Sequence, residues 1–194
     1  MSSTPPLPPF AAVLLAGGRS TRMGRDKAGL IIDGQPLWQR QLGELRALNP
    51  AELFISGRSD GPYAGAGVEI VTDAVPDLGP LAGIAATLQR TTAPLLLVLA
   101  IDLPRISRGL LTTLVTAARQ SGAGVVPQSE RGFEPLAAVY PRTALPAARA
   151  CLRGSDRSLQ HFVRHLIDAG VVSAWPFAPG WRDELRNVNT PDDL

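Results

Sequence analysis

The sequence has little of several residue types that define common protein classes. A single cysteine, Cys151, in 194 residues excludes an intramolecular disulfide framework. Aromatic residues make up 5% of the chain and the arginines are scattered, which argues against a nucleic-acid-binding surface despite the basic pI of 9.2. The longest apolar run, Leu95 to Ile101, is too short to cross a bilayer. We therefore expect a cytoplasmic protein that binds neither nucleic acid nor membrane.

Lysine is as rare as cysteine. Of the 19 basic side chains, 18 are arginine, and Lys27 is the only lysine. A chain that uses arginine elsewhere and lysine here indicates that this position needs a compact ammonium with three donors rather than a planar fork. We therefore predict that Lys27 binds phosphate.

Lys27 closes a stretch that begins as the apolar run Ala11 to Leu15, which is typical of a strand buried on both faces. The run stops at Gly17-Gly18, and the residues that follow carry clustered cations: Arg19, Arg22, Arg25 and Lys27. Glycines let backbone N–H groups approach an anion closely, and cations then neutralise its charge. Polyphosphate is the ligand that this composition favours, and a surface loop with an arginine-rich tip is the structural alternative.

Two common phosphate-binding loops do not fit this stretch. A Walker A loop requires Lys-Ser or Lys-Thr directly after its last glycine, whereas Gly24 is followed by Arg25. The dinucleotide-binding fingerprint requires glycine spacings that Gly17, Gly18 and Gly24 do not supply. The loop must therefore belong to another class.

The rest of the chain alternates between strand and helix patterns. This predicts an α/β fold: a single Rossmann-like domain with a mostly parallel twisted sheet flanked by helices. Expected strands cover residues 11–15, 30–32, 52–56, 68–72, 95–100, 125–126 and 133–140, the last interrupted by Pro135 and so kinked or at a sheet edge. Expected helices cover residues 36–48, 80–88, 107–120, 143–152 and 158–169.

The glycine-rich stretch, LAGGRSTRMGRDKA, resembles the signature L-A-G-G-x-S-x-R-M-G-x-D-K of nucleotidyltransferases that make activated sugars and cofactors. Three further segments follow in the same order and at intervals similar to theirs: Asp73 with Gly79 to Gly83, Asp102-Leu103-Pro104, and Asn187 to Pro191. Together the four segments resemble the molybdenum cofactor guanylyltransferases, the MobA-type nucleotidyltransferases. The resemblance covers nearly the whole chain.

This resemblance implies an enzyme that transfers GMP from GTP to the phosphate of molybdopterin or molybdenum-molybdopterin. The transfer releases pyrophosphate and forms the guanine dinucleotide form of the molybdenum cofactor. The resemblance also implies Mg²⁺ as cofactor, molybdoenzyme chaperones as candidate partners, and a monomer or weak homo-oligomer. Residues 1–10 are expected to form a flexible proline-rich tail that is neither signal peptide nor anchor. Residues 11–124 would be the nucleotide-binding half of the domain and 125–194 the acceptor half.

Ligands bind outside the carboxyl ends of parallel strands. The loops of the nucleotide-binding half should therefore meet along the side of the sheet where these carboxyl ends lie. Asp102 follows a buried strand and is the candidate Mg²⁺ ligand, since Mg²⁺ takes one or two carboxylates together with substrate phosphates. The structural alternative is a turn or N-cap aspartate before Pro104. By resemblance, Arg22, Lys27 and Asp102 are catalytic, and the nucleotide contacts are Leu15, Ala16, Gly17, Gly18, Lys27, Ser56, Asp73 and Asp102. Ser56 stands where some relatives have asparagine.

The acceptor contacts implied by resemblance are Glu134, Arg157, Asn187 and Asn189. The structural alternative for Arg157 is a helix start capped by Ser158, and the alternative for the asparagines is turn formation.

Two other functions stay open: a cytidylyltransferase or sugar-phosphate nucleotidyltransferase of the same fold, and a nucleotide-binding regulatory module without turnover. The Gly17-Gly18 pair favours GTP over CTP by resemblance. His161 and His165 lie four residues apart opposite an apolar helix face and are expected to be exposed.

Overall fold

The computed structural model describes residues 7–17, 27–32, 34–63, 65–72, 78–178 and 180–187, with only the backbone of residue 27. Within these residues one sheet has the strand order β10-β7-β9-β6-β1-β4-β5, with β8 paired to β7. Its strands are β1 (Phe10–Leu15), β4 (Glu52–Ser56), β5 (Glu69–Val71), β6 (Leu95–Ala100), β7 (Gly124–Ser129), β8 (Gly132–Phe133), β9 (Ala137–Pro141) and β10 (Val172–Pro176). A separate hairpin joins β2 (Ile31–Ile32) to β3 (Gln35–Pro36).

The sheet is mostly parallel, as the sequence predicts. Strands β5, β4, β1 and β6 run in the same direction, and β7 is parallel to β10. Strand β9 alone among the long strands runs against both of its neighbours, β6 and β7. Every residue of β1 and β6 is buried, because helices cover both faces of the sheet at its centre.

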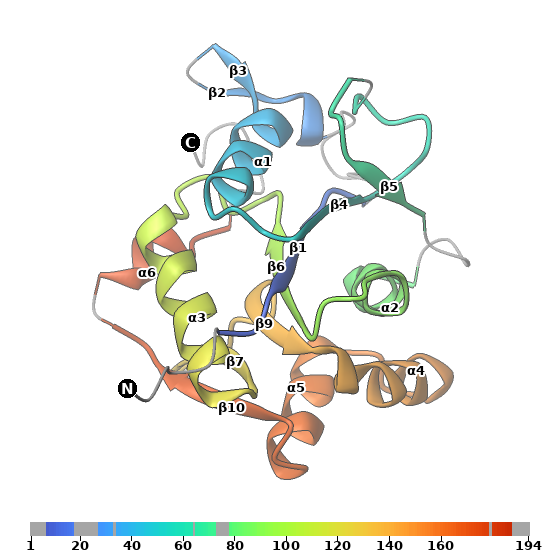
Figure 1. Cartoon of the computed structure of the whole chain (residues 1–194), viewed down its shortest axis with the longest axis vertical. Coiled ribbons are helices and arrows are strands. Elements are labelled where there is room, and N and C mark those ends of the chain that lie inside the picture. The colour runs from blue at the N-terminus through green and yellow to red at the C-terminus, as the bar shows by residue number, and fades with distance from the viewer. Residues whose placement is uncertain are drawn as a thin grey trace, which may run out of the picture.

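The helices form two layers, one on each face of the sheet (Figure 1). Helices α1 (Leu37–Ala47), α3 (Arg108–Ser121) and α6 (Trp181–Glu184) lie on one side, and α2 (Pro80–Arg90), α4 (Leu145–Arg153) and α5 (Leu159–Asp168) on the other. Short 3-10 turns, η1 (Lys27–Gly29) and η2 (Arg142–Ala144), precede β2 and α4. Side chains of β1 alternate between two cores: Ala12 and Leu14 face α1 and α3, whereas Val13 and Leu15 face α2.

The segment 133–140 corrects one prediction. It contains the end of β8, a turn at residues 134–136 and most of β9, so the predicted interruption at Pro135 is confirmed. The edge position is wrong, because β9 lies between β6 and β7. Pro135 can precede a central strand because it sits in the turn, where its missing N–H removes no ladder hydrogen bond. Its carbonyl accepts a hydrogen bond from the buried Tyr140 hydroxyl at 2.8 Å.

Two further differences concern the ends of the domain. No strand is expected from the sequence at residues 172–176, yet β10 pairs with β7 there. The burial of β10 is uneven, so its residues show no clear alternation. Near the start, Arg119 of α3 donates to the carbonyls of Pro8 at 2.7 Å and Leu7 at 3.1 Å. The proline-rich tail expected through residue 10 is therefore held to the domain from Leu7 onward.

No helix in the described ranges is long and apolar enough to span a membrane.

Candidate active site

The carboxyl ends of three adjacent strands meet at one edge of the sheet. Just past β1, the amides of Ala16 and Gly17 donate to the carbonyl of Ser56, the last residue of β4, at 2.8 and 3.0 Å. On the other side of β1, the amide of Ile101, just past β6, donates to the carbonyl of Leu15 at 3.0 Å. The structure thus brings the start of the glycine-rich stretch, Ser56 and the Asp102 turn to one edge.

These bonds change the role of the first backbone groups in the glycine-rich stretch. The sequence suggested that bare N–H groups at the glycines would face an anion, but the amides of Ala16 and Gly17 already have an acceptor in Ser56. Gly17 is exposed and lies against Gly57, where an added Cβ would come within 3.4 Å of the Gly57 Cα. Ala16 and Gly17 therefore form a rim of the site that is open to solvent at Gly17.

Tyr63 supports this rim from the connection between β4 and β5. Its hydroxyl donates to the carbonyl of Ala16 at 3.1 Å, and the side chain is almost fully buried. Its ring packs against Gly61 and meets Trp38 of α1 edge to face, with centroids 5.8 Å apart. Tyr63 is not among the residues predicted from the sequence. The available signal was a lone aromatic residue inside a polar, glycine-rich connection.

Ser56 itself faces away from the open rim. It is 4% exposed, and a Cβ added at Gly83 of α2 would approach its Oγ to 2.4 Å. The hydroxyl therefore lies beneath the first turns of α2, where only glycine leaves room for it. Helix α2 begins at this edge with Gly79 at φ 75° and Pro80 at its first position, and no side chain of the described residues caps it. Uncapped N–H groups of a first helical turn favour an anion.

Asp102 lies in the turn after β6 and is partly exposed, with Oδ1 buried. The Ala100 amide before it donates to the carbonyl of Leu136 at 2.8 Å. The N-cap alternative for Asp102 is wrong, because Ser107 caps the next helix, α3, by accepting a hydrogen bond from the Leu110 amide at 3.1 Å. Asp102 therefore does not cap α3, and it lies in the turn that the structural alternative also named.

The donor set around Asp102 fits a magnesium ion that arrives with a nucleotide. Among the described residues no group of three or more His, Cys, Asp or Glu side chains could hold a metal ion. One carboxylate at the rim of a glycine-rich loop suits Mg²⁺, which keeps most of its waters and takes substrate phosphates as ligands.

A pair of hydrogen bonds joins the two segments that carry the predicted acceptor residues Glu134 and Arg157. Gln160 of α5 accepts from the Phe133 amide at 3.1 Å and donates to the Phe133 carbonyl at 2.8 Å. Glu134 follows Phe133, and Arg157 precedes Gln160 by three residues and is exposed. Partial burial raises the pKa of Glu134. The Ser158 cap predicted for α5 is confirmed, since its Oγ accepts from the His161 amide.

Asn187 is exposed and follows α6. The Glu184 carboxylate of α6 accepts a hydrogen bond at 3.0 Å from the amide of Ser107, and Leu185 is buried in the core. The segment before Asn187 is thus attached to the loop that connects the Asp102 turn to α3. Through this contact the end of the described chain returns to the nucleotide side of the edge.

The other predicted site residues lie outside the described residues: Gly18, Arg22, Asp73 and Asn189. Of Lys27, the backbone alone is described. It begins η1, whose next residue, Ala28, is fully buried against the α1 side of the core. The roles expected for these residues stay predictions.

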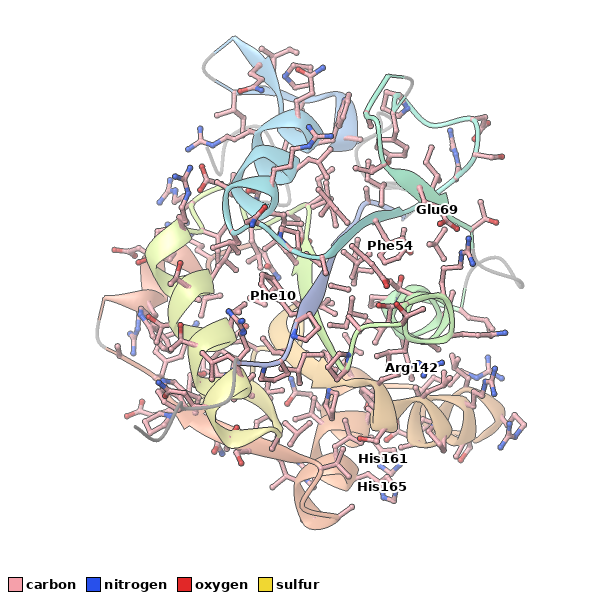
Figure 2. All side chains as sticks on the ribbon, viewed as in Figure 1. Phe10, Phe54, Glu69, Arg142, His161 and His165 are labelled. Atoms are coloured by element: carbon pink, nitrogen blue, oxygen red, sulfur yellow. The ribbon has the colours of Figure 1, made fainter. Side chains whose placement is uncertain are left out.

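His161 and His165 take no part in this edge. Both are exposed on α5, and Figure 2 shows them next to one another on the outside of that helix. The expectation of solvent exposure is confirmed.

Comparison with known proteins identifies the fold and its family. Residues 12–170 match the MobA-like NTP transferase domain. The chain belongs to the MobA-like NTP transferase family. A protein of Opitutus terrae named "Probable molybdenum cofactor guanylyltransferase" is 40% identical over 95% of this chain and 92% of its own. The molybdenum cofactor guanylyltransferase of Pseudomonas aeruginosa is 38% identical over 97% of this chain and 94% of its own.

Among solved structures, molybdopterin-guanine dinucleotide biosynthesis protein A from Archaeoglobus fulgidus has the same fold. Its TM-score is 0.77 at 23% identity, covering 94% of each chain. Both the resemblance stated from the motifs and the predicted fold class are confirmed. This MobA-like protein is therefore a nucleotidyltransferase.

Proposed function

We propose that this nucleotidyltransferase transfers GMP from GTP to the phosphate of molybdopterin and releases pyrophosphate. The observation that carries the proposal is the junction at the sheet edge, where the Ile101 amide joins the Asp102 turn to Leu15 at the start of the glycine-rich stretch. A carboxylate thus lies one strand away from the start of the stretch that we expect to bind polyphosphate. The near full-length similarity to proteins named molybdenum cofactor guanylyltransferases supports the choice of substrates.

The reaction is a displacement at phosphorus. An oxygen of the acceptor phosphate attacks the α-phosphorus of GTP, a new P–O bond forms, and the bond to the β-phosphate oxygen breaks in line as pyrophosphate leaves. The attacking oxygen is already deprotonated at neutral pH, so no general base is required. Both reactants are strongly anionic, and the protein contributes mainly by positioning them and neutralising their charge.

The residues of the edge divide this work. Lys27 and Arg22 would neutralise the polyphosphate, and the uncapped start of α2 favours an anion at the same edge. Asp102 would hold Mg²⁺, which when bound offsets phosphate charge and orients the leaving group. The rim at Ala16 and Gly17, fixed by Ser56 and Tyr63, would present a narrow backbone surface to the guanine and sugar.

The acceptor would bind on the side formed by β8, β9 and α5. Arg157 is exposed and can pair with the acceptor phosphate, whereas Glu134 is half-buried and would repel that phosphate when ionised. The Glu134 carboxylate can instead accept hydrogen bonds, and the pterin ring has an amine and ring N–H groups that can donate them. The two side chains therefore suit opposite ends of molybdopterin.

A thermal-shift comparison of GTP, CTP, UTP and ATP, each with Mg²⁺, tests the nucleotide. A ligand that binds only the native state adds about 2.7 kcal/mol at a hundredfold excess over its Kd, and GTP should give the largest shift. A larger shift with CTP would favour the cytidylyltransferase alternative. Pyrophosphate release from GTP that depends on added molybdopterin tests the transfer itself. Binding of GTP with no release would favour the regulatory module.

A further inference from the structure

Helix α1 carries a polar side chain inside its apolar row. Its buried positions are Leu37, Trp38, Gln41, Leu42 and Leu45. Gln41 is 0% exposed, although a leucine at this position would continue the row. A buried amide is costly unless its groups are hydrogen-bonded, so its contacts call for an explanation.

The Gln41 amide reaches across the core to the Asp102 turn. Its Nε2 donates to the carbonyl of Leu103 at 2.5 Å, and the two residues are 62 positions apart in sequence. The same carbonyl accepts from the Ile106 amide at 3.2 Å. Since Leu103 directly follows Asp102, the peptide next to the candidate metal ligand is fixed by a side chain from another element.

The turn is therefore held at both ends. Before Asp102, the Ile101 amide is bonded to Leu15 of β1; after it, the Leu103 carbonyl is bonded to Gln41 of α1. The backbone of Asp102 has little freedom between these two anchors. Removal of the second anchor would leave the turn attached through β1 and its own internal bond.

The side-chain oxygen of Gln41 lowers the net contribution that the amide makes to folding stability. Its Oε1 is buried, and within the described part of the chain no group donates to it. The cost of desolvating this oxygen offsets much of what the Leu103 bond contributes. An apolar side chain of similar size would remove both the hydrogen bond to Leu103 and the desolvation cost of the oxygen. The net effect on the stability of the fold would therefore be small.

We propose that Gln41 is a positioning residue that fixes the Asp102 turn, and through it the orientation of the carboxylate toward Mg²⁺ and nucleotide. The proposal rests on the proposed function for the metal and the nucleotide, while the support of the turn by Gln41 can be tested without either. It assigns α1 a part in the active site although the helix contributes no side chain to the open edge.

The experiment compares Gln41→Leu and Gln41→Met with Thr87→Val. Thr87 is a matched control: it is also 0% exposed on a helix, and its hydroxyl makes one buried hydrogen bond, to the Gly83 carbonyl at 2.8 Å, within α2. Either Gln41 variant can serve if the other folds poorly. Hydrogen–deuterium exchange is measured on the protein without metal or nucleotide, and transfer is then measured against Mg²⁺ concentration.

We expect exchange at residues 101–106 to become about tenfold faster in the Gln41 variants and to stay unchanged in Thr87→Val. The Mg²⁺ concentration for half-maximal transfer should rise severalfold, with a smaller change in KM for GTP. Unchanged exchange and an unchanged Mg²⁺ requirement would overturn the positioning role. If the unmodified protein transfers no GMP while the exchange result holds, the proposed function fails and the support of the turn by Gln41 stands.

Discussion

Two glutamates at opposite edges of the sheet are used in opposite ways. Glu52 begins β4 at the amino edge, and its carboxylate accepts from the Thr91 hydroxyl at 2.5 Å, from the Thr92 amide at 3.1 Å, and from the Thr92 hydroxyl. Burial alone would raise the pKa of Glu52, but these hydrogen bonds outweigh it and hold the pKa below its ordinary value. Glu134 lies at the other edge, just before β9, and burial raises its pKa.

The two glutamates differ in how the fold surrounds their carboxylates: Glu52 is hydrogen-bonded, whereas the dominant effect on Glu134 is burial. At the amino edge backbone hydrogen bonds join neighbouring segments. The Ala51 amide donates to the carbonyl of Phe10, and the Arg142 amide donates to the carbonyl of Pro94. The Glu52 carboxylate accepts hydrogen bonds from the loop at Thr91 and Thr92 and so joins two segments of this edge. At the carboxyl edge Asp102 and Glu134 lie on turns fixed by backbone bonds, and burial of the Glu134 carboxylate carries some cost to stability.

Asp102→Asn should have the largest effect of the substitutions considered, and the effect should be on catalysis. The amide keeps the size of the side chain but removes the charge that would hold Mg²⁺, so pyrophosphate release should fall by a factor on the order of a hundred or more. The melting temperature without ligand should stay close to that of the unmodified protein. A variant that turns over normally with Mg²⁺ would make Asp102 a purely structural residue.

Lys27 is unusually open to chemical testing because the chain contains one lysine. Pyridoxal phosphate with borohydride can modify only this side chain and the α-amino group. We expect modification at Lys27 to abolish transfer and Mg-GTP to protect it. Lys27→Arg should lose most activity, about tenfold or more, because a longer planar fork replaces a compact charge. Equal modification rates with and without bound GTP would place Lys27 outside the phosphate site.

Much of the nucleotide side could be predicted because its signals are local. Runs such as FAAVLL and LLLVLA specify buried parallel strands, and the residue after each strand then falls at the carboxyl edge. Asp102 was placed this way. The resemblance added substrates, which no periodicity could supply.

What the sequence did not reveal depends on contacts between distant segments. Gln41 resembles any helix glutamine until its bond to Leu103 is known, and Tyr63 looks like a loop aromatic until it meets Ala16. The central place of β9 was missed because Pro135 suggests an edge when read alone. Strand β10 was missed because a strand at the sheet edge with uneven burial lacks a two-residue period.

Glu52→Gln should weaken the amino edge without affecting the chemistry. The amide brings N–H groups toward Thr91 and Thr92, which are donors, so the free energy of unfolding should fall by about 1 to 2 kcal/mol while kcat and KM stay unchanged. Glu69→Gln is the matched control. Its exposed ion pair with Arg90 is screened by solvent, so its loss should change the free energy of unfolding much less than Glu52→Gln does. Urea unfolding at neutral pH measures both variants.

The pH dependence of this loss sharpens the test. Because the folded pKa of Glu52 lies below its ordinary value of 4.5, its contribution is full above pH 4.5 and disappears as pH falls through the folded pKa. The stability difference between the unmodified protein and Glu52→Gln should therefore shrink below pH 4.5. A difference that stays constant into strong acid would mean that the amide disturbs packing and that charge plays no part.

Glu134→Gln should give the smallest effect, with the opposite sign. Burial raises the folded pKa of Glu134 above its ordinary 4.5, so the unmodified protein loses stability as pH rises from 4.5 through the folded value. The neutral amide has no such loss, and the variant should be more stable at pH 7 by at most about 0.5 kcal/mol and equal at low pH. If the carboxylate binds the pterin, KM for molybdopterin should rise while KM for GTP is unchanged. A variant less stable than the unmodified protein at pH 7 would show that the Glu134 charge supports the fold, and the contrast between the two edges would no longer hold.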